Sequence, residues 1–505
     1  MDANTVIIGS GIFPTRIVDL GGTEEVIVPG DRNKKYLVHR VFKDNGVKQI
    51  GVIGWGSQAP AQAQNLRDFL HGTGIKVVVG LRKESKSAEA ARRIEFTEEN
   101  GTLGDMWEVI SSSDLVLLLI SDVAQVENYK KIFSVLKYGS TLGFSHGFLS
   151  GYLEEIGEKF PYVVNVIGVC PKGMGLSVRR LYEQGSGINC SFAVEQDFTG
   201  SATDTALAWA IAIGAPYVFK TTLGNEWRSD LFGERAILLG AIHGIVEAVY
   251  RFILEEVVSV GMAINNSQQE LAFVASAENL TGIISDTMSR GGILPVYKGI
   301  SINQKRIFET IYAHAYKAAT PLLREIYDEV NSGREIRSVV DAGNRLKKYP
   351  MPKIADTEMW KVGEIVRMKG RTNNKKPEKI NPFTAGAYIG VMMAQIDLLI
   401  EKGHSISEVC NESVIEAVDS LNPFMRAKGI DYMVDNCSTT ARLGARKWAP
   451  RFEYMCRQEV FPAYLTHLRP QAVDGELIEA FKNHKIHNAL ATCLTLRPSI
   501  NIAIK

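Results

Sequence analysis

Between residues 47 and 169 the chain alternates short apolar runs with segments of helical periodicity, and this alternation constrains the fold most strongly. The apolar runs cover residues 49–53, 76–80, 114–120, 140–144 and 162–169. Helical patterns, such as those at 59–70 and 123–136, separate the runs. Strands joined by helices of this length need right-handed crossovers, which predicts a parallel, doubly wound sheet. The first forty-five residues carry turn signals but no such alternation, and we expect them to be irregular.

From about residue 221 onward, long stretches with helical spacing replace the strand pattern. They cover residues 231–260, 268–286, 302–331 and 382–402. We therefore expect an almost entirely α-helical second half, with residues 369–379 as a solvated basic connector. The helical half also contains a weak repeat. Residues 240–248 can be laid on 386–394 with two glycines and two alanines in common, and residues 278–280 are then matched with 412–414.

Composition excludes several classes of function. Lys and Arg number 57 against 56 Asp and Glu, a net charge of +1, which argues against nucleic-acid binding and against a polybasic membrane binder. No apolar stretch approaches the ~20 residues that span a bilayer, and the start resembles neither a signal nor a transit peptide. Six cysteines without a C-x-x-C pair predict neither a disulfide scaffold nor a structural zinc site. We expect a soluble, cytoplasmic protein.

The first strand runs into a G-x-G-x-x-A motif that opens a helix. Its residues are Gly54, Trp55, Gly56, Ser57, Gln58 and Ala59. The glycines let the backbone turn tightly and approach a pyrophosphate, which the helix N-terminus attracts. Because strand, turn, helix and second strand follow in order, the motif predicts a dinucleotide-binding site.

The end of the second strand indicates which dinucleotide binds. An NAD site usually carries Asp or Glu there for the ribose 2′-hydroxyl. This chain instead has Arg82, Ser85 and Ser87, and a guanidinium with two hydroxyls suits a 2′-phosphate. The pattern therefore favours NADPH. Glu84 would instead favour NAD if its carboxylate pointed inward, where it could bind the ribose 2′-hydroxyl.

Two carboxylate pairs stand out in the helical half. Asp230 with Glu234, and Glu412 with Glu416, are each four residues apart and share one helical face. Paired like charges destabilise a helix unless something neutralises them, and a hard cation such as Mg²⁺ prefers oxygen ligands. The alternative is a solvated acidic face. The apolar residues around the second pair, including Val414 and Val418, are typical of a core rather than a surface.

These motifs belong to a larger set that closely resembles ketol-acid reductoisomerase (acetohydroxy acid isomeroreductase) in its long, plant-like class II form. The matching strings are IGWGSQ at 53–58, SHGF at 145–148, VCPKG at 169–173, SDLFGE at 229–234, NESVIE at 411–416 and DNCSTTA at 435–441. The resemblance implies an α/β Rossmann N-terminal domain followed by an all-α, internally duplicated (knotted) C-terminal region. The implied domains are 1–221 with the N-terminal extension, 222–366 and 367–505.

The resemblance also implies an activity. Such an enzyme uses NADPH and two Mg²⁺ ions per site in valine, isoleucine and leucine biosynthesis. It converts the acyloins 2-acetolactate and 2-aceto-2-hydroxybutyrate into 2,3-dihydroxy-3-methyl acids by alkyl migration and reduction. The metal ions would polarise the ketone and stabilise charge on the tertiary hydroxyl oxygen during migration.

The family's functional residues can be carried over position by position. The metal-site acids correspond to Asp230, Glu234, Glu412 and Glu416, the catalytic residues to His146, Lys172 and Glu416, and the substrate-binding residue to Ser438. Further cofactor contacts fall on Ser121, Asp122, Gln125 and Gly175. The resemblance also implies a homo-oligomer, either a dimer or a tetramer.

Two other functions stay open on the residues alone. A metal-free β-hydroxyacid or imine dehydrogenase would explain the glycine-rich motif but would leave the four acids without a role. A catalytically inactive NADPH sensor would keep the fold without the reaction. The plastid stroma is the alternative compartment, if a transit peptide has been removed.

Overall fold

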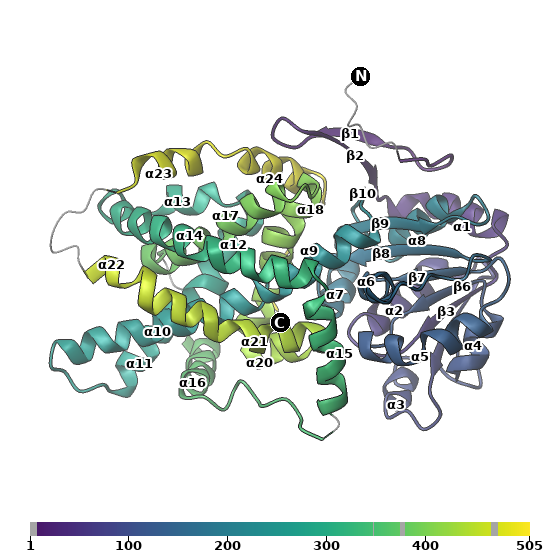
Figure 1. Cartoon of the computed structure of the whole chain (residues 1–505), viewed down its shortest axis with the longest axis horizontal. Helices are drawn as coiled ribbons and strands as arrows, with labels where there is room; N and C mark the ends of the chain where they lie inside the picture. The colour runs from purple at the N-terminus through teal and green to yellow at the C-terminus, as the bar shows by residue number, and fades with distance from the viewer. Residues whose placement is uncertain (1–7, 347, 374–378, 466–472, 505) are drawn as a thin grey trace.

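The computed structural model describes residues 8–346, 348–373, 379–465 and 473–504, and it places a sheet-based region beside a helical region (Figure 1). The strands are β1 (Arg16–Asp19), β2 (Glu24–Pro29), β3 (Gln49–Ile53), β4 (Lys76–Leu81), β5 (Leu103–Asp105), β6 (Leu115–Leu118), β7 (Thr141–Phe144), β8 (Asn165–Pro171), β9 (Cys190–Gln196) and β10 (Tyr217–Lys220). They form one sheet in the order β1–β2–β10–β9–β8–β7–β6–β3–β4–β5.

Helices cover both faces of this sheet, as the doubly wound prediction requires. They are α1 (Lys35–Asp44), α2 (Ala59–Leu70), α3 (Ala88–Arg92), α4 (Met106–Ser112), α5 (Asp122–Val135), α6 (Phe148–Ile156), α7 (Gly175–Glu183) and α8 (Ala202–Ala212), with a short 3₁₀ turn η1 (Arg32–Lys34) before α1. Helices α1, α2 and α8 share one apolar cluster with the sheet, whereas α5 and α6 belong to the other cluster. The Rossmann prediction is therefore confirmed for this region.

The parallel arrangement is confirmed for the five predicted strands, β3, β4, β6, β7 and β8, but the sheet also contains an antiparallel neighbour that was not predicted. The pairs from β5 to β8 are parallel, but β9 runs antiparallel to β8 and places Cys190 opposite Pro171. The chain between these strands turns back beside β8 after α7. Because a parallel neighbour would need a crossover to the opposite end of the sheet, the direct return gives an antiparallel pair.

The expectation of an irregular N-terminus was wrong. Strands β1 and β2 pair antiparallel across a turn in which Gly21 and Gly22 have positive φ, and β2 adds to β10. The predicted turn signal is present, but the strands around it depend on a partner nearly two hundred residues later. Tertiary pairing of this kind leaves no local periodicity to detect.

The helical region begins at α9 (Leu223–Arg235), and no strand follows β10 in the part of the chain that the structure describes. Its first half continues with α10 (Gly240–Ser259), α11 (Asn266–Phe273), the π-helical turns η2 (Val274–Glu278) and η3 (Leu280–Ile284), α12 (Ser285–Gly291), α13 (Leu294–Gly299), α14 (Ile302–Asn331), α15 (Arg334–Leu346) and α16 (Glu358–Asn373). The predicted helix at 302–331 is confirmed, whereas the predicted stretch at 231–260 is broken at Ala236 by non-helical backbone angles.

The second half of the helical region repeats this arrangement. It comprises α17 (Pro382–Glu401), α18 (Ile406–Cys410), the π-helical turns η4 (Asn411–Ile415) and η5 (Ala417–Leu421), α19 (Asn422–Lys428), α20 (Ile430–Asp435), α21 (Thr439–Met455), η6 (Cys456–Val460), α22 (Pro462–Leu465), α23 (Gly475–Lys482) and α24 (Ile486–Thr495). The start of the predicted connector at 369–379 belongs to α16, and residues 374–378 lie outside the described residues.

Two glycines on α10 and α17 show that the halves are related. Gly244 and Gly390 each approach a long helix of the other half closely. The partners of Gly244 are Ala449, Phe452 and Glu453, and those of Gly390 are Tyr312, Ala315 and Tyr316. Taken in order, each residue that contacts Gly244 lies 137 positions after the corresponding residue that contacts Gly390 (for example, 449 minus 312). The predicted pairing of 240–248 with 386–394 is therefore confirmed.

The other predicted pairing, of 278–280 with 412–414, has the wrong register. Each half contains two π-helical turns separated by a single residue, Asn279 in the first half and Glu416 in the second. Each half then begins a long helix after a serine N-cap, at Ser301 and Ser438. Both pairs of residues are 137 positions apart (416 minus 279 and 438 minus 301), whereas the predicted pairing used an offset of 134 (412 minus 278). The prediction was three positions out because it aligned acidic side chains rather than backbone features.

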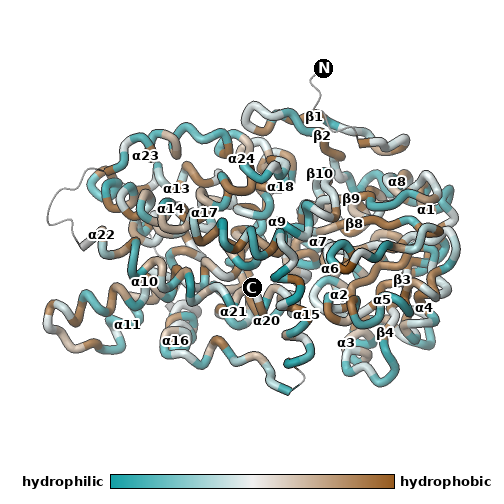
Figure 2. The backbone as a smooth tube through the Cα atoms, in the orientation of Figure 1, coloured by the Kyte–Doolittle hydropathy of each residue, from teal (hydrophilic) through white to brown (hydrophobic). Residues whose placement is uncertain are grey.

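The longest apolar helical stretches form the core. Leu223–Ser259 and Pro382–Glu401 are long and apolar enough to cross a membrane by length and composition, which corrects the expectation that no stretch approaches this length. Their most apolar windows are 72% and 89% buried within the protein. Figure 2 shows α17 and the central strands as the hydrophobic interior. These stretches are core helices.

Candidate active site

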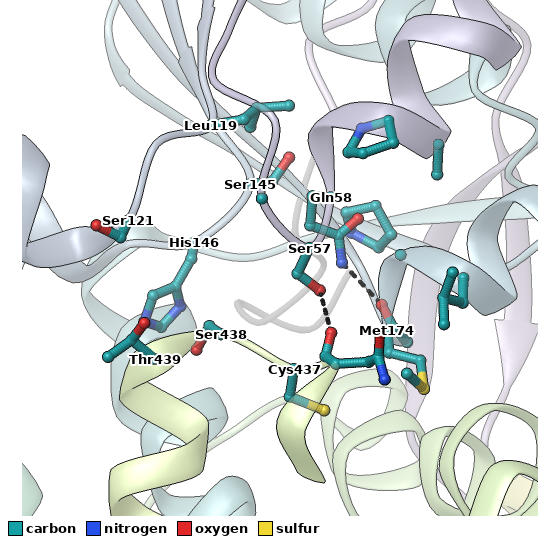
Figure 3. Close-up of a pocket in the computed structure, with 18 of the residues that line it drawn as sticks. Ser57, Gln58, Leu119, Ser121, Ser145, His146, Met174, Cys437, Ser438 and Thr439 are labelled. Atoms are coloured by element: carbon teal, nitrogen blue, oxygen red, sulfur yellow. Dashed lines mark hydrogen bonds between the residues drawn. The ribbon is translucent and has the colours of Figure 1, made fainter. Parts of the chain in front are cut away.

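A cavity of about 740 Å³ lies where the carboxyl ends of β3, β6, β7 and β8 face α9, α20 and α21. Doubly wound sheets bind their ligands at this edge. The predicted site residues that line it are Gly56, Ser57, Gln58, Ser121, Asp122, Gln125, His146, Gly175, Asp230, Glu234, Glu416 and Ser438. Figure 3 shows residues of the sheet edge facing Cys437, Ser438 and Thr439 across it. The cavity therefore joins the predicted cofactor loop to the predicted metal acids.

The glycine-rich turn leaves β3 in a conformation that other residues adopt with difficulty. Gly54 has a φ of 107°, and a Cβ there would lie 2.8 Å from the carbonyl oxygen of Leu119. Gly175 at the start of α7 packs against the same turn, because a Cβ on it would lie 1.8 Å from the carbonyl oxygen of Ser57. Gln58 Nε2 also donates to the carbonyl of Gly173 at 2.9 Å (Figure 3). These contacts shape a backbone cradle of the kind that a pyrophosphate requires.

The residues predicted to select the cofactor lie outside this cavity. Arg82 is exposed beyond the end of β4, and Ser85 and Ser87 continue the same turn, with Ser85 N–H donating to the carbonyl of Arg82. Glu84 stands in this turn with a φ of 61°. Trp55 packs edge-on against Phe96, with ring centroids 5.8 Å apart. Strand β4 lies next to β3, so the turn is placed beside the glycine-rich loop.

Helix α9 presents three carboxylates at four-residue intervals: Glu226, Asp230 and Glu234. His146, at the end of β7, places Nδ1 at 3.0 Å from Asp230 Oδ2 and 3.4 Å from Glu226 Oε2. Burial alone would lower the pKa of His146, but the charges of Asp230 and Glu226 raise that pKa well above its ordinary value. The neighbouring carboxylates therefore favour the cationic form of the imidazole.

Lys172 lies behind the cavity wall, with its side chain 1% exposed. Its Nζ lies 2.5 Å from Glu412 Oε1 and 3.7 Å from Glu226 Oε1. Burial opposes the charge on Lys172, but the two carboxylates raise its pKa well above the ordinary value. Burial would likewise raise the pKa of Glu226, yet His146 and Lys172 lower it to about 2. The positive charges of Lys172 and His146 therefore stabilise the negative charge of Glu226 between them.

The second carboxylate pair lies on the π-helical turns. Glu412 in η4 is fully buried, and Glu416, between η4 and η5, faces the cavity. Burial raises the pKa of Glu412 to about 8, with Lys172 opposing and Asp230 reinforcing the shift. Burial, Glu412 and Asp230 raise the pKa of Glu416 well above its ordinary value. Local widening of a helix into π turns is frequent at functional sites.

The donor set fits a divalent cation. Glu412 Oε2 and Glu416 Oε2 are buried and find no hydrogen-bond partner among the described residues. His146, Glu226 and Asp230 bring potential ligand atoms within 4.8 Å of one another. Burial also raises the pKa values of Asp230 and Glu234, so the acids are crowded beyond what nearby cations neutralise. A hard cation with oxygen ligands would compensate this excess.

The remaining wall of the cavity combines the hydroxyls of Ser438 and Thr439 and the polar side chains of Asp435, Asn436 and Arg442 with several apolar side chains. Ser438 is the N-cap of α21, where its Oγ accepts from Ala441 N–H at 2.9 Å. Figure 3 shows Ser438 and Thr439 on the helical side of the cavity, facing His146 of the sheet edge. Leu238, Leu239, Leu421 and Cys437 also line the cavity. A small ligand with a polar head and short alkyl groups matches this lining.

Glu226 is a site residue that the sequence prediction missed. It contacts His146 and Lys172, and its Oε2 accepts from Gly147 N–H at 2.5 Å. The signal was present, because Glu226 precedes Asp230 by the same four residues that separate Asp230 from Glu234. Extending the helical face by one turn would have found it.

Comparison with known proteins identifies relatives along nearly the whole chain. Residues 46–217 match the family model described as acetohydroxy acid isomeroreductase, NADPH-binding domain. Residues 223–371 and 383–487 match the model described as ketol-acid reductoisomerase, C-terminal domain. The chloroplastic ketol-acid reductoisomerase of Spinacia oleracea is 53% identical over 99% of this chain and 84% of its own length. The corresponding protein of Pisum sativum is 52% identical over 98% of this chain and 85% of its own length.

A solved structure shows the same fold. It is an NADH-preferring ketol-acid reductoisomerase from an uncultured archaean, with a TM-score of 0.55 and 28% sequence identity. The alignment covers 65% of this chain and 96% of that chain. The shorter relative is thus matched almost completely by part of the present fold.

Proposed function

The chain belongs to the ketol-acid reductoisomerase family, and we propose that its cavity rearranges and then reduces 2-acetolactate and 2-aceto-2-hydroxybutyrate. One matched family model of this chain is an NADPH-binding domain, and the family comprises oxidoreductases with isomerase activity that act in branched-chain amino-acid biosynthesis. The observation that carries the proposal is that Asp230, Glu234 and Glu416 line the same cavity as the glycine-rich loop. One cavity can then hold a substrate between metal acids and a hydride donor.

The reaction has two steps. The tertiary hydroxyl of the acyloin loses its proton, and its carbon becomes the new ketone. Methyl or ethyl moves with its bonding electrons to the adjacent carbonyl carbon, whose oxygen takes up a proton. The new ketone is then reduced at its carbon by a hydride, which NADPH held at the glycine-rich loop would supply, and its oxygen takes up a proton. The products are 2,3-dihydroxy-3-methyl acids.

We assign to Glu416 the removal of the proton from the tertiary hydroxyl. Glu416 is the member of the second acidic pair that faces the cavity, and its raised pKa suits a group that both accepts and returns a proton. His146 holds Asp230 and Glu226, and Lys172 holds Glu412 and Glu226, so both cations keep the acids in position. Ser438, at the start of α21, presents a hydroxyl to the substrate from the wall opposite the sheet edge.

We assign two Mg²⁺ ions to Asp230, Glu234, Glu412 and Glu416. When bound, Mg²⁺ supplies electrophilic polarisation of the ketone and stabilises negative charge on the tertiary oxygen. The chain contributes the ligands from two segments and removes water from around them. The buried, unpartnered carboxylate oxygens of Glu412 and Glu416 support this assignment. Calorimetric titration with Mg²⁺ should show binding that Asp230→Asn weakens strongly.

We assign NADPH to the glycine-rich loop, with the 2′-phosphate on Arg82, Ser85 and Ser87. The exposed position of Arg82 beside that loop supports this choice. Ser121, Asp122 and Gln125, at the end of β6, would contact the nicotinamide half. The archaeal relative is described as preferring NADH, so the preference must be measured in each chain.

The function is tested by following NADPH oxidation with 2-acetolactate and identifying the product by mass spectrometry. We expect 2,3-dihydroxy-3-methylbutyrate, loss of turnover with EDTA, and recovery with Mg²⁺. Turnover that EDTA does not affect would favour the metal-free dehydrogenase instead. NADPH binding without any oxidation under these conditions would favour the inactive sensor.

Assembly and compartment are separate proposals. We propose a homo-oligomer, either a dimer or a tetramer, which light scattering of the purified chain would measure as a multiple of 55.7 kDa. The spinach and pea relatives are named chloroplastic, which favours the plastid stroma over the cytoplasm expected from the sequence. Subcellular fractionation of the source cells would distinguish the two compartments.

A further inference from the structure

A buried hydrogen bond joins the two walls of the cavity. Thr440 Oγ1 donates to Asp122 Oδ2 at 2.5 Å, although the residues are 318 positions apart. Thr440 is 1% exposed and Asp122 is 7% exposed. A hydrogen bond to a charged acceptor in such a place is strong, because little water competes for either group.

The two ends of this bond belong to the parts that would hold the two reactants. Asp122 is the first residue of α5 and lies at the end of β6, where a nicotinamide dinucleotide approaches the sheet. Thr440 is the second residue of α21, two positions after Ser438. Its hydroxyl therefore fixes the wall that presents Ser438 relative to the wall that receives the cofactor.

Other contacts between the two regions would survive the loss of this hydroxyl. Gly343 on α15 packs against Val123, and Gly151 on α6 packs against Ile336 of α15. Ser57 Oγ donates to the carbonyl of Asn436 at 3.1 Å, as Figure 3 shows. Because these contacts hold the regions together, removing the Thr440 hydroxyl should loosen the wall locally without separating them.

We propose that Thr440 is a positioning residue for hydride transfer, acting through its bond to Asp122. This inference rests on the proposed function. The acids assigned to alkyl migration lie on α9, in η4 and between η4 and η5, on the same helical region as Ser438. Migration should therefore depend less on the distance between the two walls than hydride transfer does. Hydride transfer crosses from the cofactor wall to the substrate, and a misplacement of ~1 Å can cost about 10²-fold in rate.

The test compares Thr440→Val with Thr440→Ser in the full-length enzyme. The substrate is 3-hydroxy-3-methyl-2-oxobutyrate, the rearranged keto acid, whose reduction needs hydride transfer but no migration. We expect Thr440→Val to slow single-turnover reduction by at least about tenfold. Thr440→Ser keeps the donor and should stay within a few fold of the unmodified enzyme. NADPH and Mg²⁺ dissociation constants should change little in both variants.

A kinetic isotope effect separates positioning from general damage. With NADPH deuterated at the transferred position, Thr440→Val should show a larger isotope effect on acetolactate turnover, because hydride transfer becomes the slow step. Asp122→Asn, which weakens the acceptor from the other wall, should change the isotope effect in the same direction. The matched control is Thr384→Val, which removes another buried threonine donor, to the carbonyl of Ala275, far along the chain from either wall.

Three results would overturn the inference: reduction by Thr440→Val within about twofold of normal, an unchanged isotope effect, or an equal effect of Thr384→Val. The unmodified enzyme distinguishes this failure from failure of the proposed function. If it turns over acetolactate while Thr440→Val behaves normally, only the role of Thr440 is wrong. If the unmodified enzyme does not reduce the rearranged keto acid, the proposed function itself fails.

Discussion

Lys172 and Glu412 form a buried ion pair across 240 positions of sequence, with Nζ at 2.5 Å from Oε1. The first residue follows β8 at the sheet edge, and the second lies on the π-helical turn η4. The pair therefore connects the Rossmann region to the second acidic segment. It also neutralises one carboxylate of a site that carries an excess of them.

Breaking this pair should destabilise the protein. Lys172→Met leaves Glu412 and Glu226 without their shared cation, and an unpaired buried charge costs about 3–5 kcal/mol above about pH 8, where the carboxyl of Glu412 is ionised. The measurement is the free energy of unfolding in urea. The control is Arg324→Met, which breaks an exposed pair with Glu401 and should cost no more than about 1 kcal/mol. Equal losses for the two variants would contradict the structural role of Lys172.

The turn after β4 should determine cofactor preference. Arg82→Ala should lower kcat/KM with NADPH by the equivalent of about 1.5–3 kcal/mol, the value of a hydrogen bond to a charged group. The value with NADH should change little, because NADH lacks the 2′-phosphate. Steady-state kinetics with both cofactors measure the difference. Equal kcat/KM for NADPH and NADH in the unmodified enzyme would refute the assignment.

Both acidic segments should be needed for isomerisation. Asp230→Asn and Glu416→Gln should each abolish it under saturating Mg²⁺, although the residues are 186 positions apart (416 minus 230). Glu278→Gln is the matched control. Glu278 lies on the related π-helical turn η2 of the first half, near Arg426 at 3.8 Å, and takes no part in the cavity lining. Near-native isomerisation by either site variant would contradict a shared site.

The Glu335 network should make stability sensitive to acid. Burial would raise the pKa of Glu335, but Arg235 and Lys447 lower it to about 2 from 4.5. A lowered pKa adds stability above pH 4.5, which is lost as the pH falls toward 2. The contribution is at most about 3 kcal/mol. The difference in unfolding free energy between the unmodified chain and Glu335→Gln should therefore shrink between pH 5 and pH 3. A difference in unfolding free energy that stays constant between pH 5 and pH 3 would contradict the lowered pKa of Glu335.

The parts predictable from sequence were those with local signals. The glycine-rich turn, the helix at 302–331 and the spacing of Asp230 from Glu234 all depend on residues close together in the chain. The hairpin of β1 and β2 has no comparable signal, because β2 is stabilised by β10. The antiparallel direction of β9 likewise depends on how the chain returns to the sheet, which composition does not encode.

Within the site, the sequence predicted most of the functional residue types but not the ion pairs and hydrogen bonds between them. Lys172 was carried over from the resemblance as a catalytic residue, and its ion pairs with Glu412 and Glu226 behind the cavity wall were not predicted. The bond between Thr440 and Asp122 joins two residues that each have an ordinary local context. Such long-range contacts follow from packing, so single-sequence periodicity carries no information about them.

The most direct test of the account compares two substrates in the unmodified enzyme and in Glu416→Gln. Acetolactate requires migration and reduction, whereas 3-hydroxy-3-methyl-2-oxobutyrate requires reduction only. Because Glu416 is assigned to the proton of the tertiary hydroxyl, its substitution should lower steady-state NADPH oxidation with acetolactate far more than with the rearranged keto acid. Equal fractional losses with both substrates would mean that Glu416 serves a step common to both reactions, and would contradict the account.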